Sequence, residues 1–294
     1  MRITDKMMFE RGNVSTASAR ERVSDYQNQL STGLRIQHPG DDPAAASAIV
    51  GGSLTQARYD AIVKTASKAE NDATTADGAI QSMTDLVSRA KQLAVQMSND
   101  TYTASDRQAA GQEIDGLSRQ MVALLNTSVG GRYLFGGTKD NAPPFDAAGN
   151  YTGDANVKQL EVAPGVLENA SLRMDILVKG VGGGTDILGA LKNLSTAMAT
   201  GTSGAIQSVM GSLDASTSQL GTAIAQNGVM ISSFSSAQSL GQLASQQAQK
   251  GVSDAGDTDP FSAASSLAEA SQALQASLAA TAQGFKLTLL NFMT

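Results

Sequence analysis

The sequence predicts a mainly α-helical protein: a long coiled-coil helical rod formed by N- and C-terminal helices, with a small β-rich domain inserted in the middle. Three observations predict this fold class. Apolar residues recur in heptads over most of the chain, the pattern changes between about residues 130 and 184, and only 4% of the 294 residues are aromatic. Because aromatic side chains bury the largest areas, so few of them favour elongated helical packing over the thick core of a globular enzyme.

The first expected helix precedes Gly33, a residue that suits the C′ position at which helices end. Small residues in its apolar seam let a partner helix come close. The seam contains Phe9, Gly12, Thr16, Ala19, Val23, Tyr26 and Leu30. We therefore expect residues 1–43 to form an N-terminal helix followed by a joint.

The joint lies in LSTGLRIQHPGDDPAAASAI (Leu30 to Ile49), which holds the only histidine of the chain. His38, Asp41 and Asp42 suggest a metal or catalytic site, but a catalytic metal usually has three protein ligands, and no second histidine exists. A structural interpretation is favoured. Asp41 or Asp42 accepts from the first free N–H groups of the next helix, and Pro43 presets φ at its first position.

A helical hairpin is expected over residues 44–129. Its first helix, from about Ala44 to Asn99, would be roughly 80 Å long at 1.5 Å per residue. The seam of that helix contains Ile62, Ala66, Ala69, Ala73, Ala76, Ile80, Met83, Val87, Ala90, Ala94 and Met97. The second helix, from about Ser105 to Asn126 with Thr103 or Ser105 as its cap, has on one face Ala110, Ile114, Leu117, Met121 and Leu124. Methionines on these seams are interpreted as core residues.

Residues 130–184 are expected to form the β-rich insert. RYLFGGTKDNAPPF, VKQLEVAPG and ENASLRMDILVKG are short runs with nearly alternating apolar residues, broken by Gly, Pro and Asn. FGGTK (Phe135 to Lys139) has the letters of a phosphate-binding loop in the wrong order, and VGGGTDILGA (Val181 to Ala190) reads better as a linker. Asn169-Ala170-Ser171 matches a glycosylation triplet, which carries little weight without a secretory signal.

Helical patterns return over residues 185–253, first weakly at about Asp186 to Ala199 and then from about Ser203 to Gln249. The long seam contains Ile206, Met210, Leu213, Thr217, Leu220, Ile224, Asn227, Ile231 and Phe234. Beyond it the same positions turn polar at Gln238 and Ser245, which predicts that this end is either solvated or wound differently.

The last unit, residues 254–294, is a C-terminal helix. It follows a turn, DAGDTDP (Asp254 to Pro260), in which Asp259 suits the N-cap and Pro260 the first helical position. Its heptad-like apolar positions are Leu267, Leu274, Leu278, Phe285, Leu289 and Phe292. Chain ends are normally polar and frayed, so apolar ends need a partner. The simplest arrangement pairs the first and last helices, in a parallel or an antiparallel way.

Charge and composition exclude several function classes. Lys and Arg number 21 against 27 Asp and Glu, a formal charge of −6, so we expect no nucleic-acid partner and no attraction to an anionic membrane. The absence of cysteine excludes disulfides and thiolate metal sites. We expect no cofactor, no metal and no membrane insertion, and the start MRITDKMMFERGN has no apolar core typical of a secretory signal.

Four stretches together resemble the flagellin superfamily, and within it the family at the hook–filament junction. They are the opening MRITDKMMF, the joint with its Ser-Thr-Gly-x-Arg run and Asp-Asp pair, GRYLFGGTKDNAPPF (Gly131 to Phe145) and the ending LQASLAATAQGFKLTLLNFM (Leu274 to Met293). The resemblance assigns three sets of residues. The structural joint comprises Gly33, Arg35, Asp41, Asp42 and Pro43; the family motif comprises Arg132, Tyr133, Phe135, Gly136, Gly137, Pro144 and Phe145; the assembly interface comprises Phe9, Val23, Tyr26, Leu30, Leu274, Leu278, Phe285, Leu289, Leu290 and Phe292.

The resemblance implies a non-enzymatic, structural axial component of the bacterial flagellum. Its implied partners are further copies of itself in a ring, hook-associated protein 1 on one side, flagellin on the other, and an export chaperone on the C-terminal helix. It also implies export through the flagellar type III channel. Two alternatives remain open: a flagellin that builds the filament itself, and a secreted enzyme or adhesin on a flagellin-like scaffold, which would need His38 or Asp41 for activity.

Overall fold

The computed structural model describes the backbone of residues 2–200 and 202–293, and the side chains of residue 7, residues 10–200 and residues 202–283. The protein is mainly α-helical with a small β region in its middle, which confirms the predicted fold class. The elements in chain order are α1 (Arg2–Thr32), α2 (Pro43–Met97), α3 (Ala104–Leu125), β1 (Ser128–Val129), β2 (Arg132–Tyr133), β3 (Gln159–Ala163), β4 (Val166–Asn169), α4 (Met174–Leu177), α5 (Ile187–Thr200), α6 (Ser203–Gly256) and α7 (Pro260–Met293).

The chain divides into two compact units. One unit, which we call the terminal unit, combines residues 1–57 with residues 244–294. The other, the central unit, comprises residues 58–243. Both boundaries lie inside the long helices α2 and α6, so each unit contains a part of both helices.

Short polar side chains define the helix starts, as the sequence predicts. Thr103 is the N-cap of α3, where its hydroxyl accepts from the Asp106 N–H and the Asp106 carboxylate accepts from the Thr103 N–H. Asp259 accepts from the Phe261 N–H at 3.1 Å, and Pro260 is the first residue of α7. Each cap provides a partner for N–H groups that have none inside the helix.

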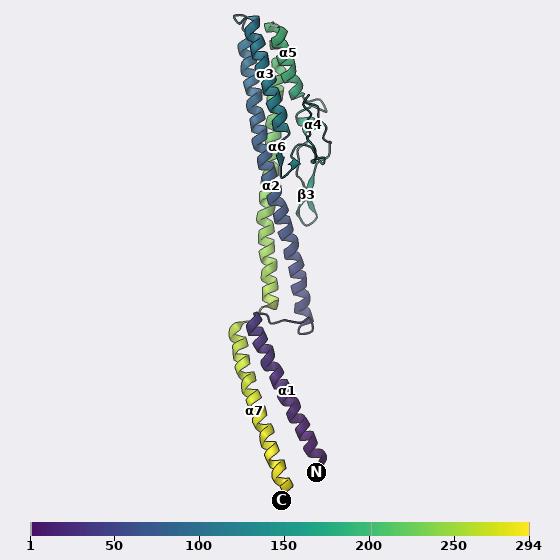
Figure 1. Ribbon diagram of the computed structural model, residues 1–294, viewed down its shortest axis with the longest axis vertical. Coiled ribbons are helices and arrows are strands. Elements are labelled where there is room, and N and C mark those ends of the chain that lie inside the picture. The colour runs from purple at the N-terminus through teal and green to yellow at the C-terminus, as the bar shows by residue number, and fades with distance from the viewer. Residues whose placement is uncertain (1, 201, 294) are drawn as a thin grey trace. The chain divides into compact units, whose positions relative to one another are not determined.

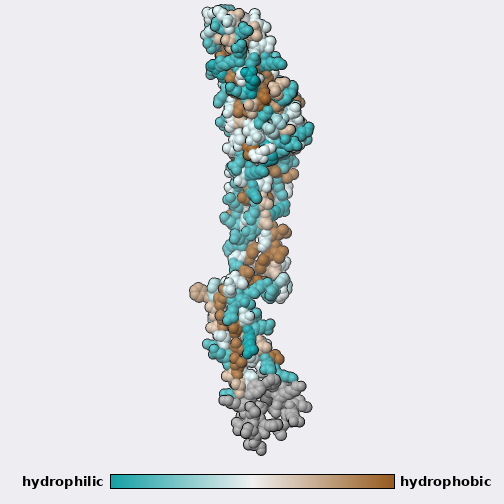
Figure 2. Space-filling view, in the orientation of Figure 1, coloured by the Kyte–Doolittle hydropathy of each residue, from teal (hydrophilic) through white to brown (hydrophobic). Residues whose placement is uncertain are grey.

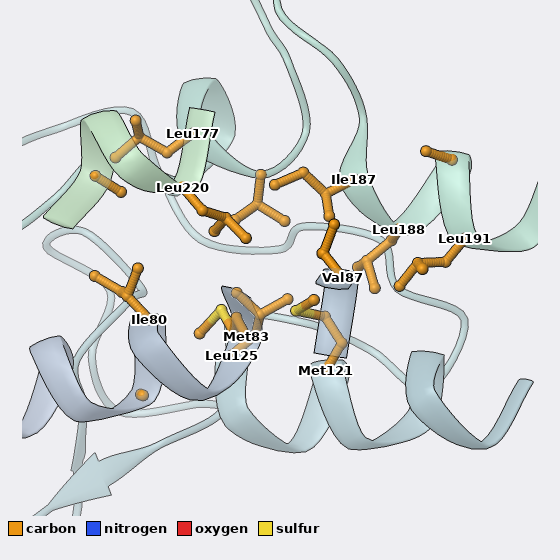
Figure 3. Packing of buried hydrophobic residues seen from close by; sticks show 14 of the residues in the cluster. Ile80, Met83, Val87, Met121, Leu125, Leu177, Ile187, Leu188, Leu191 and Leu220 are labelled. Atoms are coloured by element: carbon orange, nitrogen blue, oxygen red, sulfur yellow. The ribbon is translucent and has the colours of Figure 1, made fainter. Parts of the chain in front are cut away.

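The central unit holds the hydrophobic core, in which α2, α3, α5 and α6 lie side by side (Figure 1). Every predicted seam position of α2 is buried, from Ile62 to Met97. Figure 3 shows Met83 and Val87 of α2 facing Met121 of α3, with side chains of α5 and α6 closing the other side. Met83 and Met121 are completely buried, which confirms the interpretation of these methionines as core residues.

One prediction about the buried faces is wrong in detail. On α3 it is Leu125 that is completely buried, whereas Leu124 is half-buried. On α6 the sequence left a solvated and a differently wound course open beyond Phe234, and the structure shows that the buried face continues through the small residues Ala237 and Gly241. A search for large apolar side chains misses this continuation, because the helices approach here through residues with little or no side chain. A Cβ on Gly241 would lie 2.7 Å from Val63 Cγ2 of α2.

The predicted turn at 254–260 is also too long, because α6 continues to Gly256. Lys250 donates to both carboxylate oxygens of Asp254 one turn later, at 2.9 and 2.7 Å, a spacing that supports a helix. Gly256 is buried, and a Cβ there would lie 3.0 Å from Ile49 Cδ1 of α2. The turn therefore contains only residues 257–259.

The insert, residues 126–186, contains two separate antiparallel hairpins, β1–β2 and β3–β4. Val129 pairs with Arg132 in the first, and Leu160 pairs with Glu168 in the second, which has an irregularity between Glu161 and Ala163. One predicted β run differs: within ENASLRMDILVKG, the residues Met174–Leu177 form the short helix α4. Met174 and Leu177 are both buried, and one helical turn brings residues three apart onto the same face.

Candidate functional site

The joint between α1 and α2 (residues 33–42) is hydrogen-bonded to the segment that joins α6 to α7. Gly33 ends α1 with a left-handed backbone at φ 74°, which a residue with a Cβ adopts only with strain. The Arg35 N–H then donates to the Gly256 carbonyl at 2.7 Å, and the Thr258 N–H donates to the Gly33 carbonyl at 2.9 Å. These two bonds form a short antiparallel bridge centred on Leu34 and Asp257.

Arg35 connects three elements of this joint. Its Nη2 donates to the carbonyl of Ala255 in the last turn of α6 at 2.7 Å, where a cation also complements the helix dipole. Its Nη1 lies 3.6 Å from a carboxylate oxygen of Asp42. The other oxygen of Asp42 accepts from the Ala45 N–H at 3.1 Å in the first turn of α2, so Asp42 caps the helix that Pro43 begins.

Asp41 organises the turn itself. One of its carboxylate oxygens accepts from the N–H groups of Gln37, at 3.0 Å, and His38, at 2.8 Å. These hydrogen bonds favour the charged form and lower the pKa of Asp41, as the Ala45 N–H does for Asp42. Both carboxylates are therefore used by backbone groups. Across the described residues, no group of three or more His, Cys, Asp or Glu is arranged to hold a metal ion.

Helices α1 and α7 pair in the antiparallel way, which decides between the two arrangements that the sequence leaves open (Figure 1). The hydroxyl oxygens of Thr16 and Ser277 are 2.9 Å apart. Four residues earlier on α1, a Cβ on Gly12 would lie 3.2 Å from the Thr281 hydroxyl. The helices thus approach through small and hydroxylated residues.

The terminal unit buries few hydrophobic side chains. Within its described side chains, the buried hydrophobic residues are three alanines: Ala19, Ala263 and Ala270. Some larger apolar residues are exposed instead, and Figure 2 shows hydrophobic side chains on the face of the α1–α7 pair in view. Phe261 is 89% exposed and Val14 is 66% exposed. Since stabilisation scales with apolar area removed from water, the described side chains of this unit contribute little of it.

The residues predicted for the assembly interface fall into three groups. Half-buried residues are Val23, Tyr26, Leu30 and Leu274. Leu278 is 42% exposed. Outside the described side chains lie Phe9, Phe285, Leu289, Leu290 and Phe292. Sequence reasoning missed Phe261 and Val14, because neither falls on a heptad seam.

The aromatic residues of the predicted motif attach the insert to α3. Phe135 and Phe145 are each 1% exposed. The Asn126 side chain, directly after α3, accepts from the Phe145 N–H at 3.0 Å and donates to the Phe145 carbonyl at 2.9 Å. The Phe145 ring also packs against Tyr151 with centroids 5.2 Å apart. Pro144 is buried next to it, and its carbonyl accepts from the Thr152 N–H at 2.8 Å.

Close contacts in the structure account for the glycines and the arginine of the motif. A Cβ on Gly136 would lie 2.2 Å from the Lys139 carbonyl, and one on Gly137 would lie 2.1 Å from the Asp154 carboxylate. Arg132 pairs with Asp72 of α2 at 2.9 Å, and the Tyr133 N–H donates to the Asp140 carbonyl at 2.9 Å. These contacts fold a tight loop and fasten it to α2.

The glycine-rich segment before α5 is held by one side chain of α6. Gln219 accepts from the Thr185 N–H at 3.0 Å and donates to the carbonyls of Leu177, at 2.9 Å, and Thr185, at 3.0 Å. Asn169 of the glycosylation triplet is exposed at the end of β4, whereas Ser171 is buried and accepts from the Lys158 N–H.

Residues 6–140 match the bacterial flagellin N-terminal helical region. Flagellar hook-associated protein 3 of Escherichia coli K12 is 32% identical over 162 residues, which are 54% of this chain and 51% of that protein, so the chain spans about half the length of this relative. A flagellin of Clostridium tyrobutyricum is 34% identical over 109 residues, 36% of this chain and 28% of that one.

A solved flagellar hook-associated protein 3 from Legionella pneumophila has a TM-score of 0.59 at 11% identity, over 69% of this chain and 98% of that one. This similarity concerns the fold alone. Among the described residues, no helix is long and apolar enough to span a membrane.

Proposed function

We propose that the protein belongs to the flagellin superfamily, to whose N-terminal helical region residues 6–140 are similar, and that it is a structural, non-enzymatic part of the bacterial flagellum at the junction of hook and filament. The similarity to hook-associated protein 3 supports the junction rather than the filament. Its partners in this proposal are further copies of itself in a ring, hook-associated protein 1 and flagellin.

The terminal unit carries the proposal. It has helices of 31 and 34 residues, yet within its described part the buried hydrophobic residues are three alanines. A free helix pair that buries so little apolar surface is marginal in water, because helices depend on packing for most of their stability. Contact with neighbouring subunits would bury the exposed apolar residues and add the missing stabilisation.

The joint suits an assembly in which the terminal helices need a fixed attachment. Arg35 and Asp42 link the end of α1, the last turn of α6 and the start of α2 by hydrogen bonds and an ion pair. We expect Asp41→Ala combined with Asp42→Ala to reduce incorporation into the flagellum, since these carboxylates hold the turn and cap α2. In the same proposal an export chaperone binds α7 before assembly, and the route is the flagellar type III channel.

The test is deletion of the gene in its host. Electron microscopy of the cells, together with an immunoblot of the medium for flagellin, measures where the filament protein goes. Hooks without filaments and flagellin lost to the medium are expected, and a plasmid copy should restore attached filaments.

The similarity to flagellins keeps a second candidate, a filament subunit. In that case the deletion would leave attached filaments that are shorter or fewer, and the purified protein would polymerise by itself into long filaments. Either result would replace the junction proposal.

A further inference from the structure

A cavity of about 360 Å³ lies in the central unit between α2, α6 and the insert. Its volume is at the lower end of the range for small-molecule sites. Small side chains make the room, because α2 presents alanines here, whereas one turn further along it presents Ile80 and Met83, which fill the core. The apolar wall includes Ala69, Ala73, Ala76, Phe135, Leu160 and Met230.

Asn227 of α6 forms part of the same wall and is completely buried. Its Nδ2 donates to the Ala73 carbonyl at 2.8 Å and lies 3.4 Å from an Asp77 carboxylate oxygen, which fixes the orientation of the amide. No donor among the described residues reaches its Oδ1. A buried acceptor of this kind is unfavourable unless an N–H or O–H group approaches it, so the wall is suited to a ligand with a donor.

Positive charge gathers around the cavity of a chain whose formal charge is −6. Lys64, Lys68, Arg132 and Lys158 line it, against one carboxylate, that of Asp72. Arg132 is paired with Asp72, and Lys158 is paired with Asp140 outside the lining. Within the described part of the chain, no ion pair is found for Lys64 or Lys68 of α2. They also line an adjoining hollow of about 350 Å³, so both are accessible to an anion that enters.

We propose that this cavity binds a small amphipathic anion. Its apolar body contacts the alanines and Phe135, its acidic group binds Lys64 and Lys68, and an N–H or O–H group donates to Asn227 Oδ1. A small molecule fits better than an extended peptide because three elements enclose the volume. This inference concerns the central unit and does not depend on the proposed function.

The probe for the test is 8-anilinonaphthalene-1-sulfonate, which combines an aromatic body, one sulfonate and one N–H donor. Fluorescence titration and calorimetry on the full chain should show one saturable site per chain. Lys64→Gln with Lys68→Gln is expected to raise the Kd about tenfold, because two charged contacts are lost. The matched control, Lys91→Gln with Lys192→Gln, makes the same change in net charge on helices α2 and α5 outside the cavity, and should leave the Kd unchanged.

Two further variants probe the inner wall. Ala73→Leu fills the cavity and should abolish saturable binding, and Asn227→Leu removes the acceptor and should weaken it. Circular dichroism checks that each variant is folded, and the lysine variants test the proposal even where a core variant does not fold.

Binding to many weak sites, or equal Kd values for the cavity and control lysine variants, would overturn the proposal. So would a dimer, detected by sedimentation, that the probe dissociates and that the Lys64 and Lys68 changes abolish, because the occupant would then be a second copy of the chain.

Discussion

At the scale of single residues, Arg35 is a loop residue that makes three separate interactions within the joint. It offers its backbone N–H to Gly256, its guanidinium to Ala255 and its charge to Asp42. The side chain is 47% exposed, so solvent screens the ion pair and the hydrogen bond to the carbonyl carries most of the effect.

Arg35→Gln is expected to lower the local free energy of opening at the joint by about 1 kcal/mol, the usual contribution of such a bond. Hydrogen exchange measured on peptides covering residues 250–262 checks this. Arg58→Gln is the control, because Arg58 has a similar exposure and pairs with Glu161 of the insert. Equal exchange at the joint in both variants would contradict the role of Arg35.

Asp154 makes the stability of the fold depend on pH, in a direction that its lowered pKa defines. The Thr138 hydroxyl and N–H donate to its carboxylate and lower its pKa from 3.8 to about 2. A carboxylate with a lowered pKa stabilises the fold above its unfolded pKa, and this contribution is lost as the pH falls from about 4 to 2.

Thr138→Val should therefore raise the pKa of Asp154 and make the fold less sensitive to acid between pH 4 and 2, as measured by NMR titration of the carboxyl carbon. The control is Thr152→Val, because the Thr152 hydroxyl donates to the Pro143 carbonyl and not to Asp154. This variant should leave the titration of Asp154 unchanged. An Asp154 pKa that stays near 2 in the Thr138 variant would show that the hydroxyl is not its cause.

At the scale of elements, substitutions at two adjacent glycines near the start of α2 distinguish the contribution of helix propensity to stability from that of packing. A Cβ on Gly51 meets nothing within 4 Å, whereas one on Gly52 would lie 2.6 Å from Val252 Cγ2 of α6. Both residues are inside a helix, where alanine is favoured over glycine by about 1 kcal/mol.

Gly51→Ala is thus expected to raise the free energy of unfolding by up to about 1 kcal/mol. The free energy of unfolding of the Gly52→Ala variant should be about 1–3 kcal/mol lower than that of the Gly51→Ala variant, because α6 has to move. Denaturant titrations of the two variants, followed by circular dichroism, provide the comparison. If the two alanine variants were equally stable, the close contact of α2 with α6 at this position would be wrong.

Helix positions were predictable from sequence where apolar residues, small ones included, recur at heptad spacing. The seam of α2 is buried as predicted, and Asp259 and Pro260 begin α7 as predicted. The buried path of α6 beyond Phe234 was left open, because the heptad positions turn polar at Gln238 and Ser245, and the helix packs there through Ala237 and Gly241. The turn after α6 was predicted to begin at residue 254, which is too early. Gly256 is still part of α6 and packs closely against Ile49, so this glycine does not mark an earlier end of the helix.

The candidate site was predictable only in part. Gly33, Asp42 and Pro43 follow from general rules of helix ends, and the structure brings them together with Arg35. Ala255, to which the Arg35 guanidinium donates, lies 220 residues away in the chain, and no local pattern indicates such a contact. Asn227, whose Oδ1 has no donor among the described residues, was hidden as well, because it occupies a regular seam position among apolar residues.

At the scale of the whole molecule, stability is distributed unevenly between the two units. Among the side chains that the structure describes, the large, completely buried ones, including Phe135, Phe145 and Phe234, all belong to the central unit. Fully burying one such side chain contributes about 1.5–3 kcal/mol, several times what an alanine contributes. The described part of the terminal unit has only alanines in this role.

Hydrogen exchange of the isolated protein should therefore reveal two levels of protection. Peptides from residues 10–57 and 244–283 are expected to exchange through openings of lower free energy than peptides from residues 76–125 and 187–240. In assembled flagella the difference should shrink if neighbouring subunits cover the terminal unit. Uniform protection in the isolated protein would contradict this distribution.

The pairing of α1 with α7 also has a consequence in time. Thr16 and Ser277 are 261 residues apart, so a chain that emerges from a ribosome, or from any narrow passage, with its N-terminus first exposes α1 long before α7 exists beside it. Of the two helices, α1 has to wait for its partner, and the completed α1–α7 pair reports that every element between them has arrived.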